Sequence, residues 1–401
     1  MSKLPPNWQV KSLGEVSFIT AGQGAPQGSE NFSDKGYPFI RAGSLEKLLN
    51  GSNYDQLEKI EEEKANKHRL KLFSKGCILF AKSGMSSMKD RVIVLRSSAY
   101  VVSHLAVIQP NENLDSKYLA HWLSCFKPSR LIKDESYPSI SLDAVSKINI
   151  PLPPLPIQNQ IAEILGQADK AKQKRKGANK LTDEFLQSVF IEMFGDPVKN
   201  PKGWVLVKVD EISSKVTSGS TPLGGDSNYL LEGIRFIRSQ NILMNKIDYS
   251  DIVFISEAIH KKMLRTWVKN NDVLFNITGA SIGRVAYYEG ADDSANVNQH
   301  VCIIRTIKEK INHIYLSYLI SSESFQSRVI SQNSGATRQA FNFEQIKNFK
   351  VIKPPLQLQQ QFAEIVNKTE ALKEKQKQSE KELENLFQSL MQRAFKGKLV
   401  S

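Results

Sequence analysis

The chain has few cysteines, and they are scattered. Among 401 residues there are three, Cys77, Cys125 and Cys302, with no CxxC pair. An odd and dispersed set excludes a disulfide framework and argues against a zinc site. Each cysteine lies in or beside an apolar run, so we expect all three to be small buried hydrophobes.

A long apolar run is missing as well. No stretch approaches the roughly 20 residues that a membrane-spanning helix needs. The first residues, Met-Ser-Lys-Leu-Pro-Pro-Asn-Trp, contain no apolar core of a signal peptide. The expected compartment is therefore the cytoplasm.

Catalytic signatures are weak or missing. An enzyme that methylates an amino group of a base needs an Asn/Asp-Pro-Pro-Tyr/Phe motif, and the chain has none. The Gly-x-Gly at residues 22–24 is a weak sign of an S-adenosylmethionine loop and has no match at residues 217–222. The carboxylates at 61–63 with Lys64 resemble a nuclease metal cluster, but they lie in a charged, helix-like run without a counterpart in the second half. We interpret them as a solvated helix face.

What the chain does have is a globular composition with excess positive charge. Its length suffices for two or three domains, and its 40% hydrophobic and 24% charged residues are typical of a globular protein. The formal net charge of +13 favours a polyanionic partner, because lysine and arginine release counterions from phosphates. Charge alone does not distinguish nucleic acid from an acidic protein.

One stretch of the sequence occurs twice. Residues 153–165 read Pro-Pro-Leu-Pro-Ile-Gln-Asn-Gln-Ile-Ala-Glu-Ile-Leu, and residues 354–366 read Pro-Pro-Leu-Gln-Leu-Gln-Gln-Gln-Phe-Ala-Glu-Ile-Val. Each begins with a proline pair, which ends the preceding element. A motif of this length that recurs half a chain later indicates an internal duplication.

Each proline pair leads into a long predicted helix. Apolar residues recur at 3-and-4 spacing through residues 157–194 and again through 356–395. Gly177 would permit a small interruption of the first helix, and Gly195-Asp-Pro ends it. The two apolar stripes are most simply buried against each other. We expect antiparallel pairing, because a globular domain separates the helices; parallel pairing stays open if that domain folds back.

The segments that precede the helices are also copies of each other. Trp8 is matched by Trp204, residues 39–41 by 236–238, and His104 by His300. The offset varies slightly, as expected if loops changed length while strands and helices kept theirs. We expect the two tryptophans to be packing residues, and the two histidines to be satisfied core residues or, alternatively, phosphate contacts.

The first copy has the pattern of an α+β domain. Residues 54–70 are charged and predict a helix, and residues 115–126 predict an amphipathic helix. Short β-rich runs with intervening turns are predicted at residues 8–19, 37–41, 76–81, 91–95 and 101–108.

These patterns predict a duplicated α+β architecture. It has two tandem globular domains, each followed by a long α-helix, with the helices paired as an antiparallel coiled coil and the halves related by pseudo-twofold symmetry as in a dumbbell. The predicted boundaries are 1–152 for the first domain, 153–195 for a central helical spacer, 196–353 for the second domain and 354–401 for a C-terminal helical spacer.

The order of these motifs resembles that of a known family. The domain–helix–domain–helix repeat, the Pro-Pro-Leu-x-x-Gln-x-Gln-x-Ala-Glu-Ile entry to each helix and the Met-Phe-Gly-Asp-Pro exit at 193–197 look like the specificity (S) subunit of type I restriction–modification enzymes. Trp8 with Leu-Gly-Glu at 13–15, and Trp204 with Val-Asp-Glu at 209–211, are similar to the starts of that family's target recognition domains. The resemblance covers essentially the whole chain.

This resemblance implies a non-catalytic reader of duplex DNA. Each target recognition domain would contact one half of a bipartite site in the major groove, with the paired helices holding the halves at a fixed separation. It also implies that methyltransferase (M) subunits, two of them, dock on the helical regions, and that restriction (R) subunits join through the complex. S-adenosylmethionine, ATP and Mg would be bound by those partners, with no cofactor or metal in this chain.

DNA contacts are expected in polar loops between the short strands, since loops on a rigid scaffold usually carry recognition. Arginine can form paired hydrogen bonds with guanine, and asparagine or glutamine with adenine, each pair giving about 1–3 kcal/mol of discrimination. Arg41 and Arg238 recur in both copies, which favours a backbone contact or a structural role, whereas the loops at 82–91 and 276–284 differ and are favoured for base readout. The candidate DNA-binding residues are Arg41, Lys82, Ser83, Ser86, Ser87, Lys89, Arg91, Arg238, Gln240, Asn241, Asn276, Thr278, Ser281, Arg284, Arg338 and Gln339.

The outer polar faces of the two helix starts are the expected docking surface. Any one of these residues alone could simply cap or solvate a helix, but the whole string appears twice. The candidate partner-binding residues are Gln158, Gln160, Glu163, Gln359, Gln361 and Glu364.

Two other functions remain open at this point. One is a coiled-coil scaffold that bridges two modules binding acidic proteins. The other, a stand-alone methyltransferase, is disfavoured by the missing motif. Salt-dependent, sequence-selective binding to duplex DNA separates the specificity subunit from the scaffold.

Overall fold

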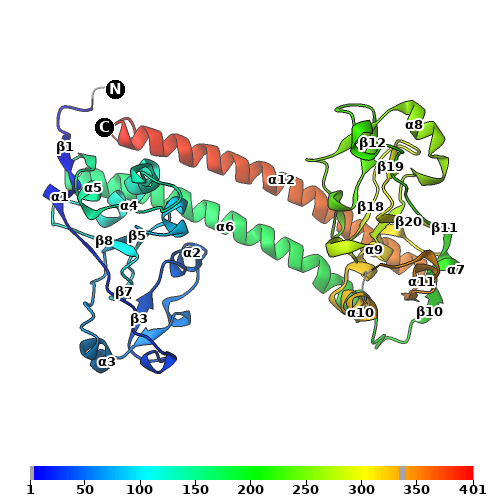
Figure 1. The fold of residues 1–401 in the computed structure, drawn as a ribbon, viewed down its shortest axis with the longest axis horizontal. Coiled ribbons are helices and arrows are strands. Elements are labelled where there is room, and N and C mark those ends of the chain that lie inside the picture. The colour runs from blue at the N-terminus through cyan, green and yellow to red at the C-terminus, as the bar shows by residue number, and fades with distance from the viewer. Residues whose placement is uncertain (1–3, 334–339, 401) are drawn as a thin grey trace. The chain divides into compact units, whose positions relative to one another are not determined.

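The computed structural model describes residues 4–333 and 340–400, and the chain divides into two compact units. Unit 1 comprises Met1–Gly177 with Lys377–Ser401, and unit 2 comprises Ala178–Gln376. The divisions fall within the two long helices, so each unit contains a segment of both (Figure 1).

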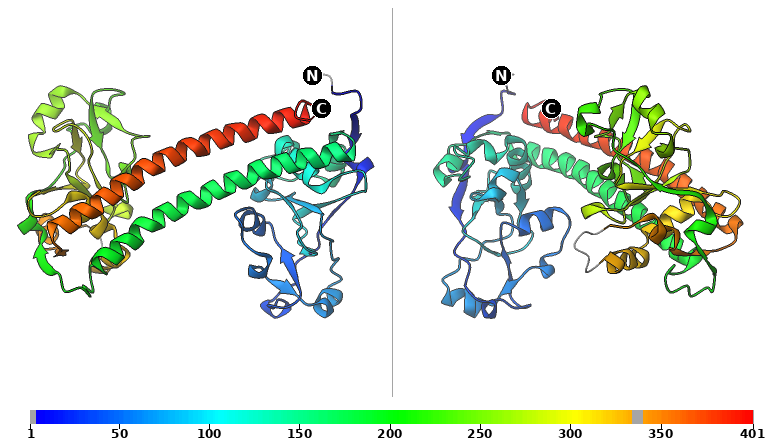
Figure 2. Two further views of the ribbon diagram at one scale, coloured as in Figure 1. Left: turned by 180° about the vertical axis from the view of Figure 1, so that it is seen from behind. Right: turned by 45° about the vertical axis from the view of Figure 1, so that its right-hand side comes forward.

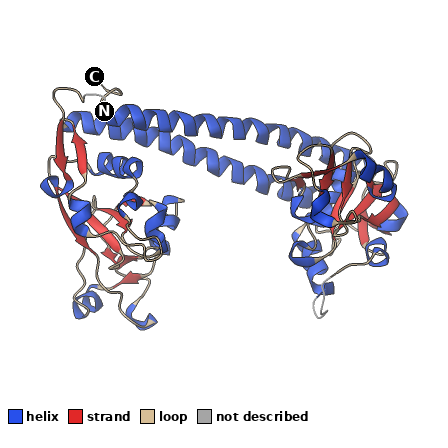
Figure 3. Ribbon diagram, turned by 45° about the horizontal axis from the view of Figure 1, so that its top comes forward, coloured by secondary structure: helices blue, strands red, loops and turns tan. Residues whose placement is uncertain are grey.

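Unit 1 contains a four-stranded antiparallel sheet and a smaller mixed sheet (Figure 3). The larger has the order β2-β8-β5-β6, formed by Ser17–Ala21, Leu105–Pro110, Ile78–Ala81 and Val92–Val94. The smaller has the order β4-β3-β7, formed by Lys59–Ile60, Tyr37–Ile40 and Tyr100–Val101. A two-stranded ribbon pairs β1 (Gln9–Ser12) with β9 (Asn149–Leu152). The helices are α1 Leu13–Val16, α2 Ser44–Leu49, α3 Glu62–Lys67, α4 Ser116–Phe126 and α5 Leu142–Ser146.

Unit 2 repeats this plan. Its sheet β11-β20-β17-β18 is formed by Ser213–Ser218, Val301–Thr306, Val273–Asn276 and Val285–Tyr287. Its mixed sheet β15-β12-β19-β16 is formed by Val253–Ile255, Ile234–Ile237, Ala295–Val297 and Trp267–Val268. The ribbon pairs β10 (Val205–Lys208) with β21 (Lys350–Lys353), and a hairpin without counterpart in unit 1 joins β13 (Ile242–Leu243) to β14 (Lys246–Ile247). The helices are α7 Val209–Ile212, α8 Glu257–Lys262, α9 His313–Ser321, α10 Glu323–Asn333 and α11 Phe343–Lys347.

The long helices are α6 (Leu155–Phe194) and α12 (Leu356–Phe395), each of 40 residues. Both start directly after a proline pair, as predicted. The Gly177 position does not interrupt α6. The helix ends at Gly195, whose φ of 77° favours glycine and whose missing Cβ would lie 2.8 Å from Pro201.

Segments of α6 and α12 run antiparallel within each unit (Figure 2). In unit 1, Lys172 of α6 lies 2.6 Å from the Glu384 carboxylate of α12. In unit 2, the Phe190 ring of α6 packs 5.4 Å from that of Phe362 of α12. The early part of one helix thus meets the late part of the other in both units. This confirms the α+β class and the antiparallel pairing.

The apolar stripes of the helices also complete the cores of the domains. In unit 1, Ile161 and Leu165 of α6 join Met391 of α12 in one buried cluster with residues of the larger sheet and α4. In unit 2, Phe190 and Val366 are part of the corresponding cluster. A long helix is therefore a structural part of the domain that it adjoins, because it buries its stripe there.

Some local predictions are wrong. Residues 54–70 are helical only in α3 and in a short 3-10 turn at Tyr54–Gln56, with β4 between them. Cys77 and Cys302 are buried as predicted, but Cys125 is exposed. In the described part of the chain no helix is long and apolar enough to cross a bilayer.

Candidate nucleic-acid interface

Two loops in equivalent positions begin where an interior strand of each larger sheet ends. In unit 1 the loop follows β5 and opens with Gly84 (φ 72°); in unit 2 it follows β17 and opens with Gly279 (φ 73°). These positive φ angles favour glycine, so both loops leave the strand through a similar turn. They close at Asp90 (φ 48°) and Gly283 (φ 90°), each followed directly by an arginine. The ends of the loops correspond, while their lengths and sequences differ.

Different contacts hold the two loops in place. In unit 1 the Asp90 carboxylate accepts hydrogen bonds from the backbone N–H and the hydroxyl of Ser129, at 2.7 and 2.8 Å. In unit 2 the Gln326 side chain of α10 donates to the Gly283 carbonyl at 2.8 Å. These supports were missed in the sequence, since they are specific to one copy and carry no repeated signal.

Matched histidines support the start of both loops. The Nδ1 atom of His104 lies 2.8 Å from the Ser83 hydroxyl, and that of His300 lies 2.6 Å from the Thr278 hydroxyl. His104 is exposed and His300 is partly exposed. The prediction of core histidines is therefore wrong: each occupies the turn before an apolar strand, β8 or β20, rather than the strand itself. The repetition of a histidine at matched positions of the two copies was the sequence feature that could have predicted its place beside the loops.

Backbone hydrogen bonds join each loop start to a third segment. The Ile140 N–H donates to the Lys82 carbonyl at 2.7 Å, and the Phe341 N–H donates to the Ile277 carbonyl at 2.9 Å. Lys82 and Ile277 also donate their own N–H groups to the carbonyls of the two matched histidines, at 2.9 and 3.0 Å. Each unit thus holds variable loop residues on a shared backbone framework.

The repeated arginines are occupied by carboxylates. Arg41 Nε lies 2.9 Å from Glu58, and Arg238 Nη2 lies 2.5 Å from Asp251, to which Gln240 also donates. Both arginine side chains therefore brace neighbouring strands of the mixed sheets. This geometry favours the structural interpretation of the pair over base reading.

The other candidates differ in exposure. The Arg91 side chain is 17% exposed and lies 2.7 Å from the Glu46 carboxylate, whereas its match Arg284 has no ion pair among the described residues. Lys89 is exposed. The remaining loop candidates are half-buried: Lys82, Ser83, Ser86, Thr278 and Ser281.

Three candidates are buried and do not face solvent. Ser87 is 2% exposed, Asn241 1% and Asn276 0%, and each is hydrogen-bonded to a backbone group of its own unit. Burial places these three side chains inside their unit, away from the surface that a duplex could reach. Arg338 and Gln339 lie outside the described residues.

Two of the predicted partner-binding residues are also buried. Gln158 accepts a hydrogen bond from the N–H of Asp115, which caps α4, at 2.8 Å; Gln359 accepts from the N–H of Asn312, which caps α9, at 2.9 Å. Each amide also donates, at 2.8 Å, to the carbonyl of the first proline of its repeated pair. Both side chains are 0% exposed, so their placement on an outer face is wrong. Their recurrence reflects a repeated attachment of helix to domain.

The other four predicted docking residues lie where the sequence places them. Gln160 and Glu163 are exposed at the start of α6, and Gln361 and Glu364 are exposed at the start of α12. Their role in binding a partner stays a prediction.

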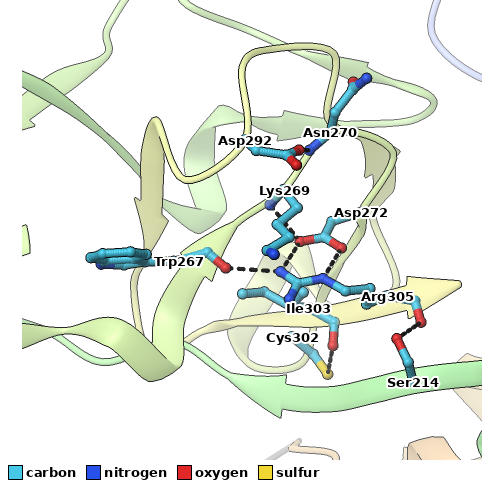
Figure 4. A network of polar contacts seen from close by, with 9 residues as sticks. All are labelled: Ser214, Trp267, Lys269, Asn270, Asp272, Asp292, Cys302, Ile303 and Arg305. Carbon is cyan, nitrogen blue, oxygen red and sulfur yellow. Dashed lines mark hydrogen bonds and ion pairs between the residues drawn. The ribbon is translucent and has the colours of Figure 1, made fainter.

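A buried ion pair distinguishes the framework of unit 2 from that of unit 1. Arg305 of β20 forms two hydrogen bonds with the Asp272 carboxylate, at 2.8 and 2.7 Å, and a third with the Trp267 carbonyl (Figure 4). The Asp272 side chain is 1% exposed, and burial raises the pKa of this carboxyl. Strand register places Gln109 at the corresponding position of unit 1.

Comparison with known proteins decides the family. Residues 5–182 and 201–385 match the family described as the type I restriction modification DNA specificity domain. The two matched ranges cover both copies of the domain and most of each long helix. The chain belongs to this family. It is a type I specificity subunit, which is the non-catalytic, DNA-recognition subunit of its complex.

Relatives of this specificity subunit match over most of their length. The EcoKI specificity subunit of Escherichia coli (strain K12) is 23% identical, covering 100% of this chain and 90% of that protein. The MjaIX specificity subunit of Methanocaldococcus jannaschii is 22% identical, covering 91% and 87%. A solved type I S subunit from M. genitalium shares the fold, with a TM-score of 0.59 at 15% identity over 98% of each chain.

Family membership confirms the resemblance read from the sequence. The cofactors of such a complex belong to its M and R subunits. The interpretations as a protein-bridging scaffold and as a stand-alone methyltransferase are accordingly set aside.

Proposed function

We propose that this specificity subunit reads a bipartite duplex site, with one half-site contacted by each copy of the α+β domain. The target recognition domains would be residues 1–152 and 196–353, and the helical spacers would be 153–195 and 354–401. The observation that carries the proposal is the pair of loops at 82–91 and 276–284. They start from the same strand end and the same hydroxyl–histidine contact, yet differ in length, sequence and support.

A shared framework with different loops suits the reading of two different sequences. Among the loop candidates, the exposed Lys89 and the half-buried Arg284 can contact phosphates or base edges. The net charge of +13 adds attraction to any duplex without sequence preference. Sequence discrimination would then come from the loops and affinity largely from the charge.

The two long helices would set the separation of the half-sites. Each has 40 residues and would span about 60 Å as a straight helix. Because the exposed pair Gln160 and Glu163 is matched by Gln361 and Glu364, we propose two docking sites for M subunits. R subunits would join through that complex, in the cytoplasm where the DNA lies.

Exchange of one loop tests the proposal. Replacing residues 85–90 by residues 280–283 keeps the flanking glycine and arginine and transfers the second loop to unit 1. Mapping of methylated adenines, in cells that carry the complete system, should show one half-site changed or lost, with the other half and the spacer unchanged. Co-purification with the M subunits controls for folding. Two unchanged half-sites in an assembled complex would contradict the assignment of readout to this loop.

A further inference from the structure

Of the two most exposed large apolar side chains in the described part of unit 1, one lies in its proposed reading loop and the other in the adjoining segment. They are Tyr137, 82% exposed, and Met85, 67% exposed. Neither belongs to an apolar cluster of the unit. Exposed apolar groups that gather at one place usually mark a binding surface, because single exposed residues are otherwise dispersed.

Backbone contacts bring the two residues to the same place. The Gly84 N–H donates to the Pro138 carbonyl at 2.9 Å, and Ser83 forms a β-bridge with Ser139. Met85 directly follows Gly84, and Tyr137 directly precedes Pro138. The two segments therefore run side by side with both apolar side chains at their exposed end.

Both segments are anchored to the domain. Pro138 is buried, and Ile140 is 2% exposed within the main cluster of unit 1. On the other side, Ser83 is bonded to His104. The backbone that carries Tyr137 and Met85 is therefore attached to the domain on both sides.

Charged residues of both signs flank the pair in the two segments. Four are cationic, namely Lys82, Lys89, Arg130 and Lys133, and three are acidic, namely Asp90, Asp134 and Glu135. The cations can contact phosphates while the apolar tip contacts bases.

We propose that Tyr137 and Met85 make an apolar contact with bases of the half-site read by unit 1. A thymine methyl group or the face of an unstacked base provides such a surface. This inference rests on the proposed function, and it adds specificity-determining residues that form no hydrogen bond with a base edge.

The test uses the complex of this subunit with its M subunits and a duplex carrying the site mapped by adenine methylation. Tyr137→Ala should weaken binding of this duplex by roughly 5- to 150-fold, the range for loss of one base–aromatic contact. Met85→Ala should weaken it less, and Tyr137→Phe should retain most of the affinity because the ring remains. Val10→Ala removes an equally unpartnered side chain, 58% exposed, on β1 of the same unit and should change nothing.

Each outcome is decisive. Unchanged affinity in both alanine variants, while the wild-type complex still prefers the mapped site over a scrambled duplex, would overturn the inference alone. Weaker assembly with the M subunits at unchanged DNA affinity would overturn it in favour of a protein contact. Failure of the wild-type complex to discriminate the two duplexes would overturn the proposed function, and the inference with it.

Discussion

Gln158 and Gln359 attach the two long helices to their domains. Each side chain is buried and hydrogen-bonded to a helix-capping residue and to a proline at the start of its own spacer. A buried amide with all its partners inside one unit cannot also serve a partner subunit. Recurrence in both copies therefore identifies a structural attachment here, while Gln160 and Gln361, two positions later, are exposed.

Replacing Gln158 by alanine should destabilise the chain by about 1–3 kcal/mol, since the buried N–H of Asp115 and two carbonyls lose their partner. Gln359→Ala should behave alike in unit 2. Urea unfolding followed by circular dichroism measures the change. The matched control is Gln160→Ala, exposed on the same helix turn, with an expected effect within about 0.5 kcal/mol. Equal effects of both substitutions would contradict the attachment role.

At the scale of elements, strands and helices were largely predictable and loop supports were not. The long helices follow from their apolar spacing and proline starts, and β3, β5, β6 and α4 follow from short β-rich or amphipathic runs. Residues 54–70 were misread, because charge suggested a continuous helix where the chain makes turns and a short strand. The contacts of Asp90 with Ser129 join segments far apart in sequence, and no periodicity signals them.

The ion pair between Arg305 of β20 and Asp272, in the turn before β17, gives a prediction about how elements are joined. Arg305→Gln introduces the residue type that unit 1 has at the matching position, Gln109. It leaves the Asp272 carboxylate buried without its cation. Removing one partner of such a pair should cost about 3–5 kcal/mol near pH 7. Lys308→Gln, a change of the same type at a side chain 91% exposed, should stay within about 0.5 kcal/mol.

The pH dependence of this variant follows from the carboxyl group. Burial raises the pKa of the Asp272 carboxyl in the folded state above its value in the unfolded chain. The contribution of this group to the free energy of unfolding is therefore fully present below the unfolded pKa and is lost as the pH rises through the folded pKa. Without Arg305 beside the carboxylate, the stability lost over this pH range is larger. The stability deficit of the variant should therefore shrink from pH 7 towards about pH 4, near the ordinary aspartate pKa. Urea unfolding at both pH values measures it, and an equal deficit would contradict the account.

At the scale of the whole molecule, one duplication accounts for the organisation. Both units use the same four-stranded antiparallel sheet, the same helix attachment and the same hydroxyl–histidine contact, while their loops differ. The chain order and the pairing of the helices were predictable from the repeat. The bases that are read were not, since they depend on individual loop side chains. We propose that the paired helices set the spacing between two half-sites.

Shortening both helices by about one turn tests whether they set this spacing. Deleting residues 174–177 and 380–383 together retains the Lys172–Glu384 contact on one side and the Thr182–Gln376 contact on the other. Four residues of helix span about 6 Å, or roughly one to two base-pair steps of 3.4 Å. Methylated adenines would be mapped in cells that carry the complete system with the wild-type or shortened subunit. We predict a spacer shorter by about one or two base pairs between unchanged half-sites; altered half-sites with an unchanged spacer would contradict the account.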